Sequence, residues 1–180
     1  FDASLLDLFK HWFNPSFLVL QKIDWATPAN ILEKIIAYEA VHEINSWDDL
    51  RARLEPEDRR CFAFFHPIIP NEPLIFVEVA LSSNMTESIK EVIKIDRSVT
   101  LDQDINTTIF YSISNCQEGL SGISFGNFLI KNVAHQLKQE IQGLNRFATL
   151  SPAPGFTKWL KENSIDQNIQ EDILLKEALV

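Results

Sequence analysis

Residues 121–127 form a stretch of small and polar residues that suits the binding of a phosphate group. The stretch reads Ser-Gly-Ile-Ser-Phe-Gly-Asn, and a helical pattern begins near its end. Backbone N–H groups at a helix N-terminus bind phosphate without basic side chains, and glycines leave room for a pyrophosphate. An ordinary strand-to-helix loop is the alternative, since neither Gly-x-x-x-x-Gly-Lys-Ser/Thr nor Gly-x-Gly-x-x-Gly is present. The candidate phosphate-binding residues are Ser121, Gly122, Ile123, Ser124, Phe125, Gly126 and Asn127.

Ser151 is the candidate for a catalytic or substrate-orienting hydroxyl. It follows a predicted strand and precedes Pro152 and Pro154. Because proline restricts the backbone, the hydroxyl is expected to be held in place at the strand end. A helix N-cap or turn serine is the alternative. Ser151 does not lie in a Gly-x-Ser-x-Gly elbow, so a hydrolase that uses this serine as its nucleophile is not indicated.

Two further residues are weaker candidates for acid–base chemistry. His66 lies in a proline-rich stretch near Glu72, so it fits a general base oriented by a carboxylate or a plain surface-loop histidine. Glu78 interrupts an apolar strand. If buried, it would have a raised pKa and suit a base; if the sheet is half covered, it would face solvent.

Charge and composition exclude several functional classes. The 180 residues carry 25 acidic and 16 basic side chains, a net charge of -9, which argues against nucleic acid and anionic membranes as partners. Cys61 and Cys116 are too few for a disulfide framework and are expected to be reduced thiols in a cytoplasmic protein. No zinc-type ligand spacing, transmembrane span or signal peptide is expected.

Hydrophobic periodicity predicts an α/β (α+β) chain with a mixed sheet flanked by helices. The 46% hydrophobic content is enough for a real core. Strands are expected at 17–23, 61–65, 74–81, 107–114 and 147–150. Helices are expected at 5–13, after an N-cap at Thr27, after a capping box at Ser46, after a cap within 84–87, at 125–142 and from 156. Residues 66–73 are expected to form a stiff loop because they hold three prolines. Leu129, Val133 and Leu137 are expected to share a buried helix face.

Five stretches of the chain resemble the malonyl-CoA decarboxylase family. They are WFNPSFLVLQKIDWATPANILEKI (12–35), YEAVHEINSWDDLRARL (38–54), RRCFAFFHPIIPNEPLIFVEVAL (59–81), TIFYSISNCQEGLSGISFGNFLIK (108–131) and LSPAPGFTKWL (150–160). The last two stretches are the most specific, because they combine the candidate phosphate loop with the Ser-Pro turn. The resemblance covers roughly residues 12–160 in order.

This resemblance implies a catalytic domain similar to the GNAT acyltransferase fold, with a strand–phosphate loop–helix–strand CoA site. In that fold two neighbouring strands splay apart around the pantetheine arm, and here these would be 107–114 and 147–150. The family's catalytic serine corresponds to Ser151 by its Leu-Ser-Pro context. Its downstream histidine has no match before Val180, and the role is not transferred to His66 or His135.

The implied reaction converts malonyl-CoA to acetyl-CoA and carbon dioxide without a metal or organic cofactor, in a homo-oligomer such as a tetramer. The expected parts are a helical lead-in with the first strand (1–56), an incomplete CoA-binding core (57–163) and an acidic segment (164–180). The chain would be the middle portion of a longer enzyme. The alternatives are a GNAT acetyltransferase with Glu78 or His66 as base, and a non-catalytic acyl-CoA-binding or assembly module.

Overall fold

The computed structural model describes residues 2–86, 88–120, 123 and 125–163. The chain forms two compact units, Phe1–Leu150 and Ser151–Val180, which are described separately. The predicted acidic segment 164–180 lies outside the described residues. Among those that are described, no helix is both long and apolar enough to cross a membrane.

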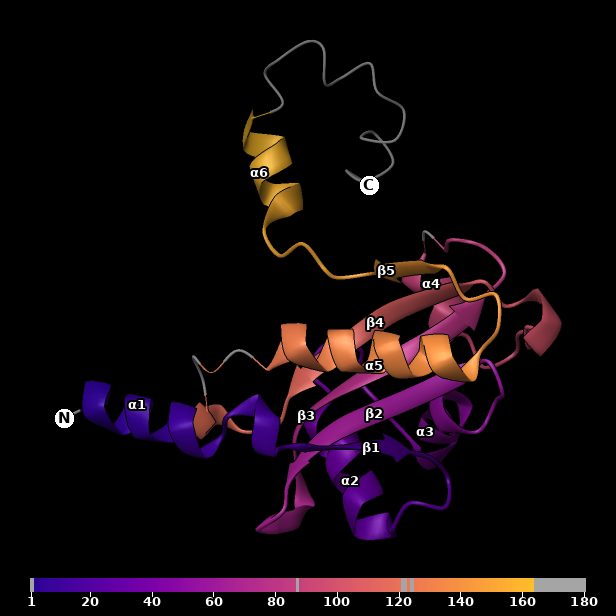
Figure 1. The fold of residues 1–180 in the computed structure, drawn as a ribbon. Coiled ribbons are helices and arrows are strands. Elements are labelled where there is room, and N and C mark those ends of the chain that lie inside the picture. The colour runs from indigo at the N-terminus through magenta and orange to yellow at the C-terminus, as the bar shows by residue number, and fades with distance from the viewer. Residues whose placement is uncertain (1, 87, 121–122, 124, 164–180) are drawn as a thin grey trace. The chain divides into compact units, whose positions relative to one another are not determined.

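The first unit is built on a five-stranded sheet whose strand order follows the chain (Figure 1). The strands are β1 (Val19–Ile23), β2 (Arg59–His66), β3 (Ile69–Ser82), β4 (Thr107–Asn115) and β5 (Arg146–Thr149). The first four pair antiparallel, and β5 pairs parallel with β4. The predicted mixed sheet is therefore confirmed.

Helices and short 3-10 turns connect these strands. The helices of this unit are α1 (Asp2–Trp12), α2 (Ala29–Tyr38), α3 (Trp47–Leu54), α4 (Ile89–Ile93) and α5 (Gly126–Glu140), and the 3-10 turns are η1 (Pro15–Phe17), η2 (Asp102–Asp104) and η3 (Glu118–Leu120). In the second unit, α6 spans Phe156–Asn163.

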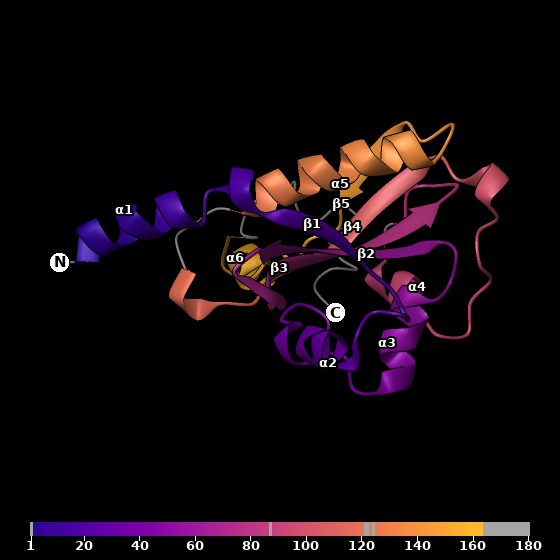
Figure 2. The same cartoon turned by 60° about the horizontal axis from the view of Figure 1, so that its bottom comes forward.

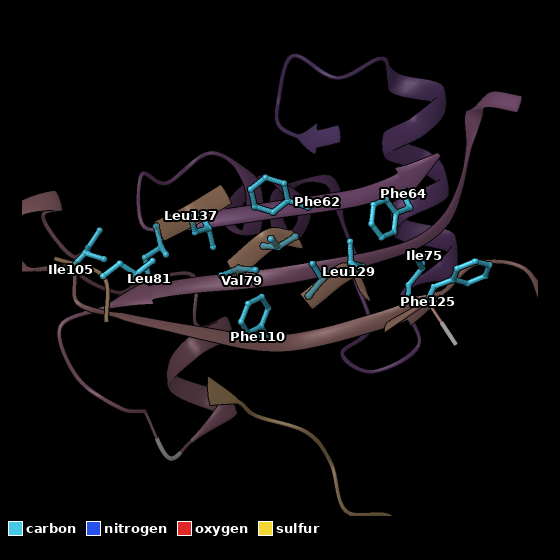
Figure 3. Close-up of a cluster of buried hydrophobic side chains, with 13 residues drawn as sticks. Phe62, Phe64, Ile75, Val79, Leu81, Ile105, Phe110, Phe125, Leu129 and Leu137 are labelled. Atoms are coloured by element: carbon cyan, nitrogen blue, oxygen red, sulfur yellow. The ribbon is translucent and has the colours of Figure 1, made fainter. Parts of the chain in front are cut away.

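Both faces of the sheet are covered, because alternate strand residues point to opposite faces. Figure 2 shows α5 on one face and α2 and α3 on the other. Under α5, apolar residues of β2, β3 and β4 pack against the predicted helix face; Figure 3 labels Phe62, Phe64, Ile75, Val79, Leu81, Phe110, Leu129 and Leu137 among them. The opposite face packs Ala63, Phe65 and Phe76 against Ile35 and Leu50 of α2 and α3.

Replacing Leu137 with alanine tests whether α5 is a true core element. Its side chain is fully buried, so the substitution should lower the free energy of unfolding by about 2–5 kcal/mol. Urea denaturation measures this loss. Gln136→Ala, at an exposed position of the same helix, is the control and should change stability by about 0.5 kcal/mol or less. A loss well under 1 kcal/mol at Leu137 would contradict the packing described.

The predicted stiff loop at 66–73 was wrong, because β3 already begins at Ile69. Phe65 pairs with Pro73 and His66 with Ile69, so Pro70 falls in an irregular part of the ladder. Proline lacks the N–H that a regular ladder uses and is tolerated at such irregularities. The prolines therefore mark a bulged hairpin end rather than the absence of strand.

The helix N-termini were predicted with mixed success. Ser46 does cap α3, since its hydroxyl accepts the N–H of Asp49. Thr27 does not cap α2, which begins after Pro28; its hydroxyl instead accepts the N–H of Asp24 in the preceding turn. The prediction of a cap within 84–87 was also wrong, because α4 begins at Ile89, directly after Ser88. Residue 87 lies outside the described residues. Short polar side chains compete for local turns as readily as for helix ends.

Candidate functional site

Strands β4 and β5 run together for only part of their length. Pairing extends from Thr107↔Arg146 to Phe110↔Thr149, and the N–H of Leu150 then donates to the carbonyl of Phe110 at 2.8 Å. Strand β4 continues to Asn115 along β3. The part of β4 beyond Phe110 thus extends past its last pair with β5. This is the geometry in which an extended ligand can lie against backbone N–H and C=O groups.

The N-terminus of α5 has the features of an anion-binding helix end. The helix begins at Gly126 after Phe125, whose side chain makes no capping hydrogen bond, and its first turn holds no acidic residue. The N–H of Leu129 donates to the carbonyl of Phe125, as in a regular first turn. The first N–H groups of a helix have no partner within it, and the helix dipole favours negative charge there.

The structure describes four of the seven candidate phosphate-loop residues. The side chain of Phe125 is buried in the core under α5. The backbone N–H of Ile123 already donates to Leu120 O, so it is not available to a phosphate. Asn127 is exposed in the first turn of α5. Ser121, Gly122 and Ser124 lie outside the described residues.

The glycine at position 126 is not what leaves room for a phosphate, contrary to the expectation from the sequence. A Cβ at this position would meet Ile113 Cγ2 at 3.9 Å and Ile75 Cδ1 at 4.0 Å. A side chain there would therefore point first to the sheet rather than to a bound phosphate. The positive-φ glycines among the described residues are Gly143 and Gly155, so backbone strain does not reserve position 126 for glycine.

Ser151 is the first residue of the second unit and is exposed. It follows Leu150, whose N–H is fixed to β4. The helix-cap alternative was wrong for this serine, because α6 begins only at Phe156, directly after Gly155 with its φ of 79°. The hydroxyl is thus left without a helix-capping role, and its predicted catalytic role stays a prediction.

The expected pairing of His66 with Glu72 is not formed. His66 ends β2, and its Nδ1 accepts the N–H of Ile68. Glu72 instead accepts hydrogen bonds from Lys34, Tyr38 and Gln117. Partial burial acts to raise the pKa of Glu72, but these three bonds hold it below its ordinary value. Glu72 therefore connects α2 to the sheet through hydrogen bonds and does not orient His66 as a base.

Glu78 is buried, which excludes the solvent-facing alternative. Its Oε2 accepts a hydrogen bond from Arg53 of α3 at 2.9 Å. Burial raises the pKa of Glu78 to about 8, although the nearby guanidinium acts against the rise. Among the described residues, its Oε1 and the hydroxyl of Tyr111 have no hydrogen-bond partner. With no exposed surface, Glu78 is unsuited to take a proton from a bulky amine substrate.

A polar network missed by the sequence reasoning lies against β4. The Glu39 carboxylate accepts the hydroxyls of Ser112 at 2.7 Å and of Ser114 at 3.2 Å. His42 Nε2–H donates to the carbonyl of Tyr111 at 3.1 Å. The one available signal was the alternation of serine with apolar residues late in an otherwise apolar strand, because buried hydroxyls need partners.

The described residues contain no group of three His, Cys, Asp or Glu side chains able to hold a metal ion. Cys61 and Cys116 are both free and buried, as expected for reduced thiols. Burial raises the pKa of both thiols, so neither is an activated nucleophile.

Comparison with known proteins gives a family and a fold. The model of the malonyl-CoA decarboxylase C-terminal domain matches residues 16–178. Malonyl-CoA decarboxylase, mitochondrial, of Anser anser anser is 44% identical over 158 residues, which are 87% of this chain and 31% of that protein. The crystal structure of malonyl-CoA decarboxylase from Agrobacterium vitis matches with a TM-score of 0.89 and 48% identity, over 99% of this chain and 48% of that one. The chain thus spans about a third of the curated relative and about half of the solved one.

A more distant likeness concerns the fold alone. An aminoglycoside acetyltransferase from an uncultured soil metagenomic sample matches with a TM-score of 0.50 and 11% identity, over 88% of this chain and 93% of that one. Together with the mixed sheet and its flanking helices, this likeness confirms the predicted GNAT-like fold.

Proposed function

Because the chain belongs to the malonyl-CoA decarboxylase family, we propose that it binds malonyl-CoA and takes part in its conversion to acetyl-CoA and carbon dioxide. The observation that carries the proposal is that pairing with β5 ends at Phe110↔Thr149 while β4 continues to Asn115, in the same unit as the N-terminus of α5, where Phe125 makes no side-chain capping hydrogen bond. The first feature suits a pantetheine arm and the second a pyrophosphate.

The chemistry needs no electron acceptor beyond the substrate. The C–C bond to the carboxylate breaks, carbon dioxide leaves, and the electron pair becomes an enolate conjugated with the thioester. A proton added to the α-carbon completes acetyl-CoA. The protein must therefore stabilise an oxyanion and deliver one proton. In this proposal Ser151 donates a hydrogen bond to the malonyl head. The pyrophosphate is held by backbone N–H groups within residues 121–127 other than that of Ile123, which donates to Leu120 O.

Two measurements on the 180-residue chain test this function. Calorimetric titration measures the binding of coenzyme A, and release of carbon dioxide from malonyl-CoA measures turnover. Binding with turnover supports the decarboxylase. Binding with acyl transfer to an amine and no carbon dioxide would favour the acetyltransferase alternative, and binding without chemistry would favour the binding module. Absence of coenzyme A binding would contradict all three.

Placing a negative charge on Asn127 tests the phosphate site. Asn127→Asp should stabilise the free protein by about 0.3–1 kcal/mol, because an acid in the first helical turn interacts favourably with the helix dipole. The same charge should repel the pyrophosphate and weaken coenzyme A binding by roughly tenfold or more, since hydrogen bonds to a charged group contribute about 1.5–3 kcal/mol each. Thermal unfolding and calorimetry measure the two effects.

Gln136→Glu provides the matched control for this experiment. It adds the same charge at an exposed position in the second half of α5. It should leave coenzyme A affinity nearly unchanged. Equal affinities for Asn127→Asp, Gln136→Glu and the parent protein would place the phosphate elsewhere.

A homo-oligomer belongs to the same proposal, because the family resemblance implies one. Light scattering of the purified chain would test it. The cytoplasmic location expected from the sequence stays a prediction.

A further inference from the structure

Strand β4 has an irregularity directly after Phe110, its last residue paired with β5. Glu78 of β3 pairs with Ser112 and the next residue, Val79, pairs with Phe110, so Tyr111 is an extra residue in β4. Such a bulge changes the direction of the strand and of the side chains that follow. Beyond it, β4 is paired with β3 on one side. Among the described residues of the first unit no strand pairs with its other side after Phe110, and we call that side the free edge. The course of this free edge therefore depends on contacts other than a second strand.

The segment that joins α2 to α3 supplies those contacts. Glu39 ends α2, and its carboxylate accepts the Ser112 and Ser114 hydroxyls as well as the N–H groups of Val41 and His42. The N–H of Ala40 donates in turn to Ser114 Oγ at 3.2 Å. The carboxylate is thus shared between its own segment and two buried serines of β4.

His42 holds the bulge itself. Because a carbonyl oxygen only accepts, the 3.1 Å contact requires that His42 Nε2 carry the proton and donate it to Tyr111 O. The two rings also lie near each other, with centroids 6.4 Å apart. One side chain thus fixes both the carbonyl and the ring of the extra residue.

Arg53 of α3 adds two further hydrogen bonds to this network. Its guanidinium donates to the Glu43 carbonyl at 3.0 Å and to Glu78, the residue of β3 that pairs with Ser112. The segment 39–43 is therefore hydrogen-bonded to Arg53 of α3 and to three residues of β4, and Arg53 links it to β3. These hydrogen bonds all lie close to the bulge at Tyr111.

We propose that Glu39 and His42 are positioning residues for the acyl group. By fixing the bulge at Tyr111, they set the orientation of the free edge of β4 against which the thioester and its carboxylated end would lie. The inference rests on the proposed function, because it takes the edge of β4 to be the acyl-CoA site. Neither residue need touch the substrate.

The test compares binding of two ligands that do not react. One is coenzyme A, and the other is the sulfonate analogue of malonyl-CoA, which cannot lose carbon dioxide. The parent protein should prefer the analogue. His42→Asn, whose shorter amide cannot reach Tyr111 O, should lose affinity for the analogue by about tenfold, the effect of misplacing one hydrogen bond to a charged group. Its affinity for coenzyme A should change less than about twofold.

Rescue and control variants separate positioning from general stability. His42→Gln places an amide N–H close to the position of the imidazole Nε2–H and should retain the preference for the analogue. Glu39→Gln should weaken that preference in the same direction as His42→Asn. His135→Ala, which removes an exposed histidine from α5, and Glu33→Gln, on an exposed part of α2, should match the parent. Thermal unfolding of each variant checks that it is folded.

Three results would overturn the assignment. Parent-like selectivity in both His42→Asn and Glu39→Gln would show that the network does not act on the acyl group. Equal loss of both ligands in folded His42→Asn and His42→Gln would show a merely structural role. If the parent protein bound neither ligand, the proposed function would fail and this inference with it. If the parent preferred the analogue and the variants kept the same preference, only the inference would fail.

Discussion

Ser151→Ala should reduce the release of carbon dioxide from malonyl-CoA by about 10²–10³-fold, which is the loss expected when one hydrogen-bond donor to a developing oxyanion is removed. Affinity for coenzyme A should stay within about twofold, because the proposed phosphate contacts lie in residues 121–127 and not at this serine. Ser151 is exposed and does not cap α6, so its removal should leave the fold intact. Turnover and calorimetry on the same preparation measure the two quantities.

Ser98→Ala is the matched control for this experiment. It removes a hydroxyl from another exposed serine, one in the first unit, and should leave turnover unchanged. Parental turnover in Ser151→Ala would exclude the proposed role. A matching loss in coenzyme A affinity would instead indicate that Ser151 serves general binding.

Arg53→Met should have the largest effect on stability. The substitution leaves Glu78 without its cationic partner in a fully buried position. Removing one member of a buried ion pair costs about 3–5 kcal/mol. We expect a loss of this size at pH 9 in urea denaturation. Arg51→Met, on an exposed part of the same helix, should cost about 1 kcal/mol or less.

The loss should depend on pH in a defined direction. Glu78 keeps its proton in the folded protein up to about pH 8, against an ordinary value of 4.5. Between these values the unfolded chain binds fewer protons than the folded one, so the parent protein loses stability as the pH rises. Without Arg53 the folded pKa rises further, and the decline continues past pH 8 at up to roughly 1.4 kcal/mol per pH unit. The difference in free energy of unfolding between Arg53→Met and the parent should therefore be smallest near pH 5. A difference that does not change with pH would contradict the pairing of Arg53 with Glu78.

The fold was predictable wherever neighbours in sequence decide the structure. The spacing of Leu129, Val133 and Leu137 predicts one helix face, and all three residues are fully buried. The β-branched and aromatic run that begins at Thr107 predicts β4 in the same way. The start of β3 was not predictable, because its prolines argue against a strand and only pairing across the hairpin places them at an irregularity.

The polar part of the site could not be read from local patterns. Whether Glu78 is buried depends on Arg53, which lies 25 residues away, and the partner of Ser112 is Glu39, 73 residues away. A sequence pattern shows which faces are apolar but not which charged groups meet when the faces close. The residues 121–127 and Ser151 came from spacing and family resemblance, and their roles remain predictions.

The order of the sheet has a consequence for how the protein folds. Strands β2 and β3 are joined by two residues, Pro67 and Ile68, so this hairpin closes the shortest loop of the sheet. Loop closure is less costly in entropy for nearby segments, so this central pair is expected to form early, with β5 added only after α5 has crossed the sheet. Core substitutions in β2 and β3 should then slow refolding, whereas Leu137→Ala should mainly speed unfolding.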